Sequence, residues 1–285
     1  MRVAAGEHCA MTTDPFPSSY PRWAISLLVL GTFLIVNAIG LSVFRAWAAE
    51  LTGWPRMFAL ATLGYGLYLA APLAVAALLF GRGRMFAALG LTASPWTALM
   101  LAAACTAVVW IGYAASASPV PTEGLAVAIT RSALLPGTAE ELLFRAFLFG
   151  FLHRFAGWHF LPAALLSSLI FGLEHWYQGN AASQALGIVA LTGIGGLWWS
   201  WLLVKWRWNV WVPIAFHVSL NAAWETFDVA DNALGPAATV VLRLACIALS
   251  IVATVVVARR RERLTISDLK ETRGLRAQPR DDASI

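Results

Sequence analysis

The sequence predicts an all-α membrane protein, a polytopic bundle of about eight transmembrane helices. Of its 285 residues, 59% are hydrophobic and 12% are charged, whereas ordinary soluble domains have roughly 45–50% apolar and about 25% charged residues. Eight apolar runs each approach the ~20 residues that a helix needs to cross the hydrocarbon core. No long polar stretch precedes residue 259, so a separate water-soluble catalytic domain is excluded.

The eight runs follow one another with short connections, as in a single membrane domain over residues 24–258. They comprise residues 24–44, 57–80, 96–117, 125–152, 160–177, 181–204, 210–227 and 234–258. The first three and the sixth contain no charged residue, whereas the other four do. Residues 1–23 lack a short apolar region with a small-residue cleavage site. We therefore expect the first run to remain in the protein after an N-terminal cytoplasmic segment.

The positions of Lys and Arg predict the orientation. Basic residues gather in connections that fall on one side of the bundle, namely Arg82, Arg84, Arg154, Lys205, Arg207, Arg259, Arg260, Arg261 and Arg263. Short cytoplasmic loops are rich in such residues, so both termini are expected in the cytoplasm and the protein in the inner or plasma membrane. The tail, residues 259–285, has 8 Lys and Arg and 5 acids. It lacks a folded module with interleaved aromatic residues, so no nucleic-acid partner is expected.

The fourth run holds three charged residues close together, Glu140, Glu141 and Arg145. An ionisable group at mid-bilayer costs from ~2.5 to over ~10 kcal/mol, so each needs a partner, water or a function. We expect a helix to restart after a break at Pro136-Gly137, with Thr138 as its cap.

In that helix Glu141 and Arg145 are i,i+4 neighbours and can pair. Glu140 lies about 100° around the axis from Glu141, so it faces a different surrounding. Two roles can thus be divided between the adjacent acids, although the pair of Glu141 and Arg145 could also serve only to hold two helices in register.

Three further polar residues lie in the fifth and seventh runs. His175 comes near the end of the fifth run, and His217 and Asn221 are i,i+4 neighbours on one face of the seventh. Together with Glu140 they supply what water-driven amide hydrolysis requires: a carboxylate base, imidazoles that share protons and an amide donor for an oxyanion. Glu174, beside His175, is interpreted as an ordinary interface carboxylate.

These residues form three motifs in a fixed order on successive apolar runs. They are Glu140-Glu141-x-x-x-Arg145, Phe171-x-x-x-His175 and His217-x-x-x-Asn221. This arrangement resembles the CPBP family of intramembrane proteases, also called the Abi family, which includes the type II CAAX prenyl endopeptidases and bacteriocin-processing proteins. The resemblance covers roughly residues 125–227, and the first three runs carry no motif.

The resemblance implies an intramembrane endopeptidase and assigns a role to each residue. Glu140 matches the catalytic glutamate that activates a water, and His217 helps to hold that water. His175 and Asn221 match residues that stabilise the oxyanion. Glu141 and Arg145 support the architecture of the site. The implied partners are the lipid bilayer and a membrane-associated peptide or protein substrate.

No cofactor is favoured, because a mechanism based on glutamate and water needs no metal. Members of this family are nevertheless often called metalloproteases. From chemistry alone, Glu140, His175 and His217 could form a two-His, one-carboxylate zinc site with water in the fourth position. The chain has no His-Glu-x-x-His motif, which favours the metal-free alternative.

Two other classes of function remain open from the sequence. The first is a proton-coupled transporter or channel, in which Glu140, His175 and His217 form a relay across the bilayer. Such a relay needs ionisable groups along the whole path, whereas these residues fall in one band of depth. The second is a non-catalytic membrane scaffold or immunity protein that retains the motifs and acts by binding.

Overall fold

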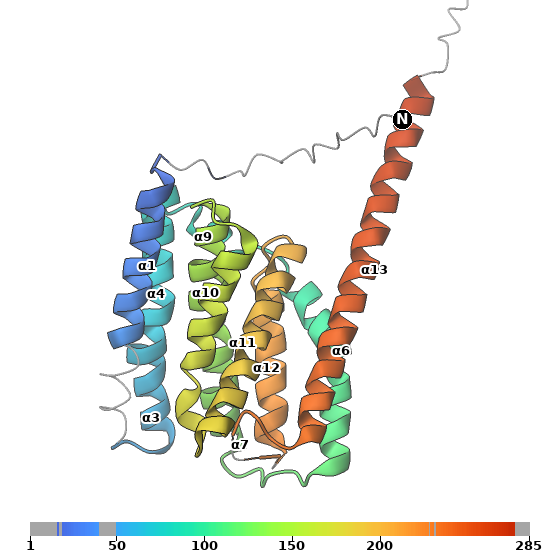
Figure 1. Ribbon diagram of the computed structural model, residues 1–285. Coiled ribbons are helices and arrows are strands. Elements are labelled where there is room, and N and C mark those ends of the chain that lie inside the picture. Colours follow the sequence, from blue (N-terminus) through green and yellow to red (C-terminus); the bar gives the residue numbers. More distant parts are fainter. Residues whose placement is uncertain (1–15, 17–18, 40–49, 228, 231, 277–285) are drawn as a thin grey trace, which may run out of the picture.

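The structure is a computed structural model that describes residue 16 and residues 19–39, 50–227, 229–230 and 232–276. Within these residues it contains helices and no strand, apart from one isolated bridge between Pro119 and Phe227. The predicted all-α class is confirmed. The helices pack side by side as a bundle (Figure 1).

The described part of every predicted apolar run contains helix. In chain order the helices are α1 (Arg22–Ile39), α3 (Gly53–Ala59), η2 (Leu60–Tyr65), α4 (Gly66–Phe80), α5 (Met85–Ala88), α6 (Pro95–Ser116), α7 (Leu125–Ile129), η3 (Thr130–Leu134), α8 (Leu135–Glu140), η4 (Glu141–Phe149), α9 (Gly150–Arg154), α10 (Phe160–Leu173), η5 (Trp176–Gln178), α11 (Ala182–Lys205), α12 (Trp211–Thr226) and α13 (Ala237–Arg276). The segments η2, η3 and η4 are π-helical, and η5 is a 3₁₀ turn.

Among the described residues, four helices are long and apolar enough to cross a membrane, and the protein is a multi-pass membrane protein. They are Arg22–Ile39, Pro95–Ser116, Ala182–Lys205 and Ala237–Arg261. Other apolar helices are shorter: α4 has 15 residues, α10 has 14 and α12 has 16. Since about 20 residues are needed to span the hydrocarbon core, the number of eight crossing helices stays a prediction.

The predicted helix break at Pro136-Gly137 is wrong. The chain is helical without interruption from α7 to α9, and Thr138 lies inside α8 without making a side-chain cap. Pro136 occupies the first turn of α8, where a missing N–H is tolerated. The Leu135 N–H bonds to the Thr130 carbonyl, and this wider π-helical turn joins η3 to α8 without a gap.

The π-helical segment η4 lies at the centre of the bundle, and all nine of its residues are buried. The Phe144 ring packs edge-on against Phe33 of α1 and Phe171 of α10, with a centroid distance of 5.2 Å in each case. The Ser167 hydroxyl of α10 donates a hydrogen bond of 2.9 Å to the Phe144 carbonyl. These contacts enclose Glu141 and Arg145 in the interior of the protein.

Two glycines allow close approach between helices that carry the polar motifs. A Cβ at Gly137 of α8 would lie 2.6 Å from Cγ2 of Val218 on α12. A Cβ at Gly172 of α10 would lie 2.6 Å from the Val189 carbonyl oxygen on α11. Small residues are typical of such contacts in membrane bundles. They bring α8 close to α12 and α10 close to α11.

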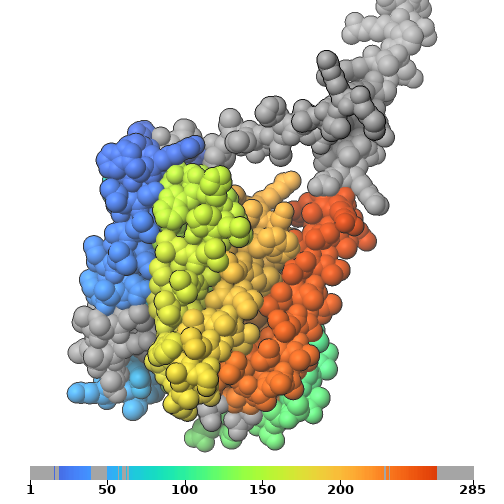
Figure 2. Space-filling view, in the orientation of Figure 1, coloured from blue at the N-terminus to red at the C-terminus, as the bar shows by residue number. Residues whose placement is uncertain are grey.

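The outer surface carries large apolar side chains. Leu161, Leu165 and Leu169 are exposed along one side of α10, as expected of a helix that meets lipid rather than water. Figure 2 shows α1, α10, α11 and α13 following one another across one face of the molecule. Beyond the apolar run, α13 continues as helix to Arg276. The predicted terminal segments are residues 1–23 and 259–285. Of these, residues 1–15, 17–18 and 277–285 lie outside the described residues.

Candidate active site

A cavity of about 490 Å³ lies between the helices that carry the three motifs. Glu140, His175, His217 and Asn221 all line it. Glu140 is the last residue of α8, His175 follows the end of α10, and both His217 and Asn221 lie on α12. The fold therefore places all four predicted residues around one space, although they come from three separate stretches of chain.

The two adjacent glutamates face different surroundings, as their helical spacing predicts. Glu140 is half-buried and lines the cavity. Glu141 has no exposed surface and does not line it. The boundary between the cavity and the closed core thus falls between two consecutive residues.

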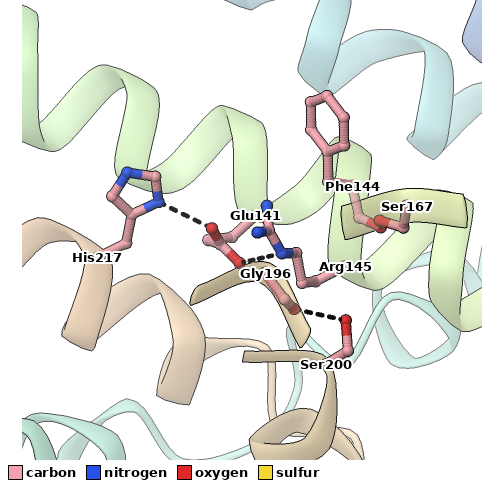
Figure 3. A network of polar contacts seen from close by, with 7 residues as sticks. All are labelled: Glu141, Phe144, Arg145, Ser167, Gly196, Ser200 and His217. Carbon is pink, nitrogen blue, oxygen red and sulfur yellow. Dashed lines mark hydrogen bonds and ion pairs between the residues drawn. The ribbon is translucent and has the colours of Figure 1, made fainter. Parts of the chain in front are cut away.

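Glu141 contacts two basic side chains, which Figure 3 shows together. Its Oε2 lies 3.3 Å from Nε of Arg145, the predicted i,i+4 partner. Its Oε1 lies 2.8 Å from Nδ1 of His217 and accepts a hydrogen bond from that ring. A buried carboxylate needs such partners because an uncompensated charge in the interior is strongly destabilising. The contact with His217 joins η4 to α12 and was not predicted from the sequence.

Arg145 is fully enclosed and is stabilised largely by aromatic faces. Its guanidinium carbon lies 4.0 Å from the centroid of the Phe171 ring and 5.0 Å from that of Trp199, within the range of cation–π attraction. Neither Nη atom has a hydrogen-bond partner among the described residues. On α11, a Cβ at Gly196 would lie 2.8 Å from Nη2, so the glycine leaves the space that the guanidinium occupies.

His217 is fixed by a hydrogen bond on one side and by a ring on the other. Its imidazole stacks on Trp199 with a centroid distance of 4.5 Å and an interplanar angle of 17°. Because a carboxylate can only accept, the hydrogen bond to Glu141 places a proton on Nδ1. The other ring nitrogen, Nε2, is thereby left for contacts away from Glu141 (Figure 3).

His175 is oriented by the end of its own helix. It follows the last turn of α10, and its Nδ1 lies 2.8 Å from the Phe171 carbonyl oxygen. The final carbonyls of a helix have no N–H partner within it, so this one can accept the imidazole proton. The bond leaves Nε2 of a neutral ring as an acceptor.

Asn221 is held by a carbonyl that a proline makes available. Its Nδ2 donates a hydrogen bond of 2.9 Å to the carbonyl oxygen of Ser132 in η3. In an α-helix the N–H of residue 136 would bond to that oxygen, but Pro136 has no N–H. One amide hydrogen of Asn221 is used in this way, and the second can serve another acceptor.

Other polar residues of the wall were not assigned chemistry from the sequence. Glu174, expected to be an ordinary interface carboxylate, lines the cavity and accepts a hydrogen bond from Asn37 of α1. Arg243 of α13 donates to the carbonyls of Ala233 and Leu234, and it thereby fastens the connection between α12 and α13. Asp228 and Asp231 of the same connection lie outside the described residues.

The three residues of the zinc alternative come from separate stretches of the chain. In the described part of the chain, no three His, Cys, Asp or Glu side chains gather closely enough to share one. Glu140, His175 and His217 line the same cavity without forming such a cluster.

Comparison with known proteins gives a family for the segment that contains this site. Residues 122–223 match the family model described as "Type II CAAX prenyl endopeptidase Rce1-like". No curated protein and no solved structure matches the chain. The matched residues include all three motifs, and the family is one of proteases. The segment that holds the cavity thus matches the model of the Rce1-like type II CAAX prenyl endopeptidases, which confirms the resemblance to the CPBP intramembrane proteases.

Proposed function

We propose that this protein is an intramembrane endopeptidase that hydrolyses a peptide bond in a membrane-associated peptide or protein. The observation that carries the proposal is the cavity wall, on which a carboxylate, two imidazoles and a carboxamide meet inside the segment that matches the family. Hydrolysis of an amide requires a base for water, donors for the oxyanion and a proton for the leaving nitrogen.

In the proposed mechanism Glu140 activates the water. Its carboxylate takes a proton as the water oxygen attacks the carbonyl carbon of the substrate. The same proton then passes to the departing nitrogen, the C–N bond breaks, and a new carboxyl group and a new amine result. Glu140 is the base in this scheme because it is the carboxylate of the pair that lines the cavity.

We assign the water to Glu140 together with His175, and the oxyanion to Asn221 together with His217. This exchanges the two imidazoles relative to the roles that the resemblance implies. The support comes from their partners. His175 donates a hydrogen bond from Nδ1 to a neutral carbonyl oxygen, that of Phe171. In this scheme its Nε2 therefore accepts a hydrogen bond from the water. His217 donates a hydrogen bond from Nδ1 to the Glu141 carboxylate, and in this scheme an N–H at its Nε2 is the donor to the oxyanion.

Asn221 supports the same assignment. It lies one helical turn from His217 on α12, and both side chains line the cavity. Its hydrogen bond to Ser132 fixes the amide, so the remaining N–H needs little reorganisation when negative charge develops. In this scheme Glu141 and Arg145 act as positioning residues, because they hold His217 without reaching the cavity themselves.

No step of this scheme uses a metal ion. We therefore expect cleavage by the purified protein to continue after treatment with a chelator, with metal content measured on the same sample. Loss of cleavage on chelation, restored by zinc, would contradict the metal-free scheme and would assign chemistry to a metal instead.

Glu140→Gln is the direct test of the proposed function. The amide preserves shape but cannot take a proton from water, so we expect cleavage to fall by about 10²- to 10⁴-fold. The measurement compares the termini of membrane proteins in cells that produce the original chain, Glu140→Gln or Glu123→Gln. Glu123 lies in the exposed connection before α7 and serves as the matched control.

The outcome also separates the competing functions. Product termini with the original chain and with Glu123→Gln, but not with Glu140→Gln, would support the protease. A cellular phenotype that survives in Glu140→Gln would favour a non-catalytic scaffold. A relay for protons would need a polar path beyond the cavity, whereas the buried residues that follow Arg145 in η4 and α9 are apolar: Ala146, Phe147, Leu148, Phe149, Gly150, Phe151 and Leu152.

A further inference from the structure

The two ends of the bundle differ in charge. At the end where α1 begins and α9 ends (Figure 1), basic residues occupy the connections and helix termini: Arg22, Arg82, Arg84, Arg154, Lys205, Arg207, Arg259, Arg260 and Arg261. At the other end, the connection over residues 40–52 contains one basic residue, Arg45, and the connections over residues 117–124, 174–181 and 227–236 contain no Lys or Arg. Arg56, Arg131 and Arg243 lie on helices toward that second end. The positive-inside rule therefore orients the first, basic end toward the cytoplasm.

The cavity lies at the second end. Its wall includes Tyr177 and Gln178 of η5, the short helix after α10, and Glu225 in the last turn of α12. It also includes Asn232 and Ala233 of the connection to α13. Tyr177 is 68% exposed, so the wall reaches the surface of the protein there.

The interior of the basic half, between its basic end and the four cavity residues, is closely packed. Phe147, Leu148 and Phe151 have no exposed surface. The Phe151 ring packs against Phe147 and Phe155, with centroid distances of 5.2 and 5.0 Å. Side chains at this density leave no channel for a peptide. In the described part of the chain these residues separate the four cavity residues from the basic end.

The geometry points to substrate entry from the non-cytoplasmic side of the membrane. This inference rests on the proposed function and names its substrate class: a peptide segment exposed at the non-cytoplasmic face, either in a translocated chain or at the outer end of a transmembrane helix. A segment in the cytoplasm would meet the packed aromatic core instead of Glu140.

The orientation can be measured without any proteolysis. The background variant is Cys9→Ser in the full chain, because the remaining cysteines, Cys105 and Cys246, are buried. One reporter is Tyr177→Cys at the cavity mouth. The other is Gly83→Cys in the basic connection before α5, where a Cβ meets nothing within 4 Å and both neighbouring arginines are kept.

The probe is a membrane-impermeant maleimide applied to intact cells. We expect it to label Tyr177→Cys at least about tenfold more than Gly83→Cys, and to label both equally after permeabilisation. The reverse ratio in intact cells would overturn the inference. The pair of reporters is measured again with Glu140→Gln added, so the result does not depend on whether the protein cleaves anything.

The positions of cleavage sites give a second readout. Product termini on the non-cytoplasmic side of substrate proteins would support the inference. Termini in cytoplasmic segments would overturn it while leaving the proposed protease intact. If no product is found at all, the proposed function fails, and the labelling ratio still decides on which side the cavity opens.

Discussion

The two halves of the bundle are built from the same helices but differ in what fills them. In the half that contains η4 and α9, the interior is closely packed with aromatic and aliphatic side chains that enclose the ion pair of Glu141 and Arg145. In the other half, α8 and α12 border a cavity that carries ionisable groups. One continuous helix crosses both, and its surroundings change between Glu140 and Glu141. The comparison teaches that the packed half encloses Glu141 and Arg145, while the open half leaves room for the water and substrate of the proposed reaction.

The largest effect on stability is expected in the packed half. Phe147→Ala removes a fully buried ring that contacts Phe151, and such truncations typically lower the free energy of unfolding by about 3–5 kcal/mol. Thermal unfolding of the purified protein in lipid nanodiscs measures the change. Leu165→Ala, on the exposed side of α10, is the control and should change the midpoint little. Equal effects of the two variants would contradict the contrast between core and surface.

In the open half, Asn221→Ala should reduce the rate of cleavage far more than it reduces stability, which falls only by the loss of the hydrogen bond to Ser132. Loss of one oxyanion donor lowers kcat by about 10²- to 10³-fold. Single-turnover cleavage, with the unfolding midpoint measured in parallel, separates the two effects. Ser219→Ala is the matched control on the same helix. Ser219 bonds to Thr106 and Trp110 rather than lining the cavity, so its removal should affect stability by about 1 kcal/mol. A rate loss as large as that of Asn221→Ala would refute the distinction.

Substitutions at two neighbouring glycines of α11, Gly195 and Gly196, test how closely this helix packs against Arg145. Gly196→Ala would place Cβ 2.8 Å from Nη2 of Arg145, whereas a Cβ at Gly195 meets nothing within 4 Å. We expect Gly196→Ala to destabilise the protein by about 1–3 kcal/mol through overpacking. Gly195→Ala should be neutral or stabilising by up to about 1 kcal/mol, since alanine favours helix. The measurement is the midpoint of thermal unfolding. Equal midpoints for the two variants would contradict close packing of α11 against Arg145.

The sequence predicted much of the helical framework because apolar runs of membrane length have few alternative structures. Each described run is helical, and Glu141 and Arg145 pair as their i,i+4 spacing predicts. The continuous helix through Pro136 was not predicted. A proline usually indicates a helix boundary, but a π-helical turn before it accommodates the missing donor.

Contacts between distant residues could not be predicted in the same way. The hydrogen bond between Glu141 and His217 joins positions 76 residues apart, and it depends on how η4 packs against α12. One local feature of the sequence indicates the contact of Asn221 with Ser132. A proline at position 136 frees the carbonyl four residues earlier, which marks Ser132 as an acceptor that needs a partner.

The central claim, that Glu140 activates the attacking water, is tested most directly with purified protein. The measurement is single-turnover cleavage, in lipid nanodiscs, of a substrate identified from the product termini. The cleavage rates of the original chain and of Glu140→Gln are compared once both proteins are shown to unfold at the same midpoint temperature. The account predicts a rate at least about 100-fold lower for Glu140→Gln. A rate for Glu140→Gln within about twofold of the original would contradict it, because the loss of a general base changes a rate by far more than that.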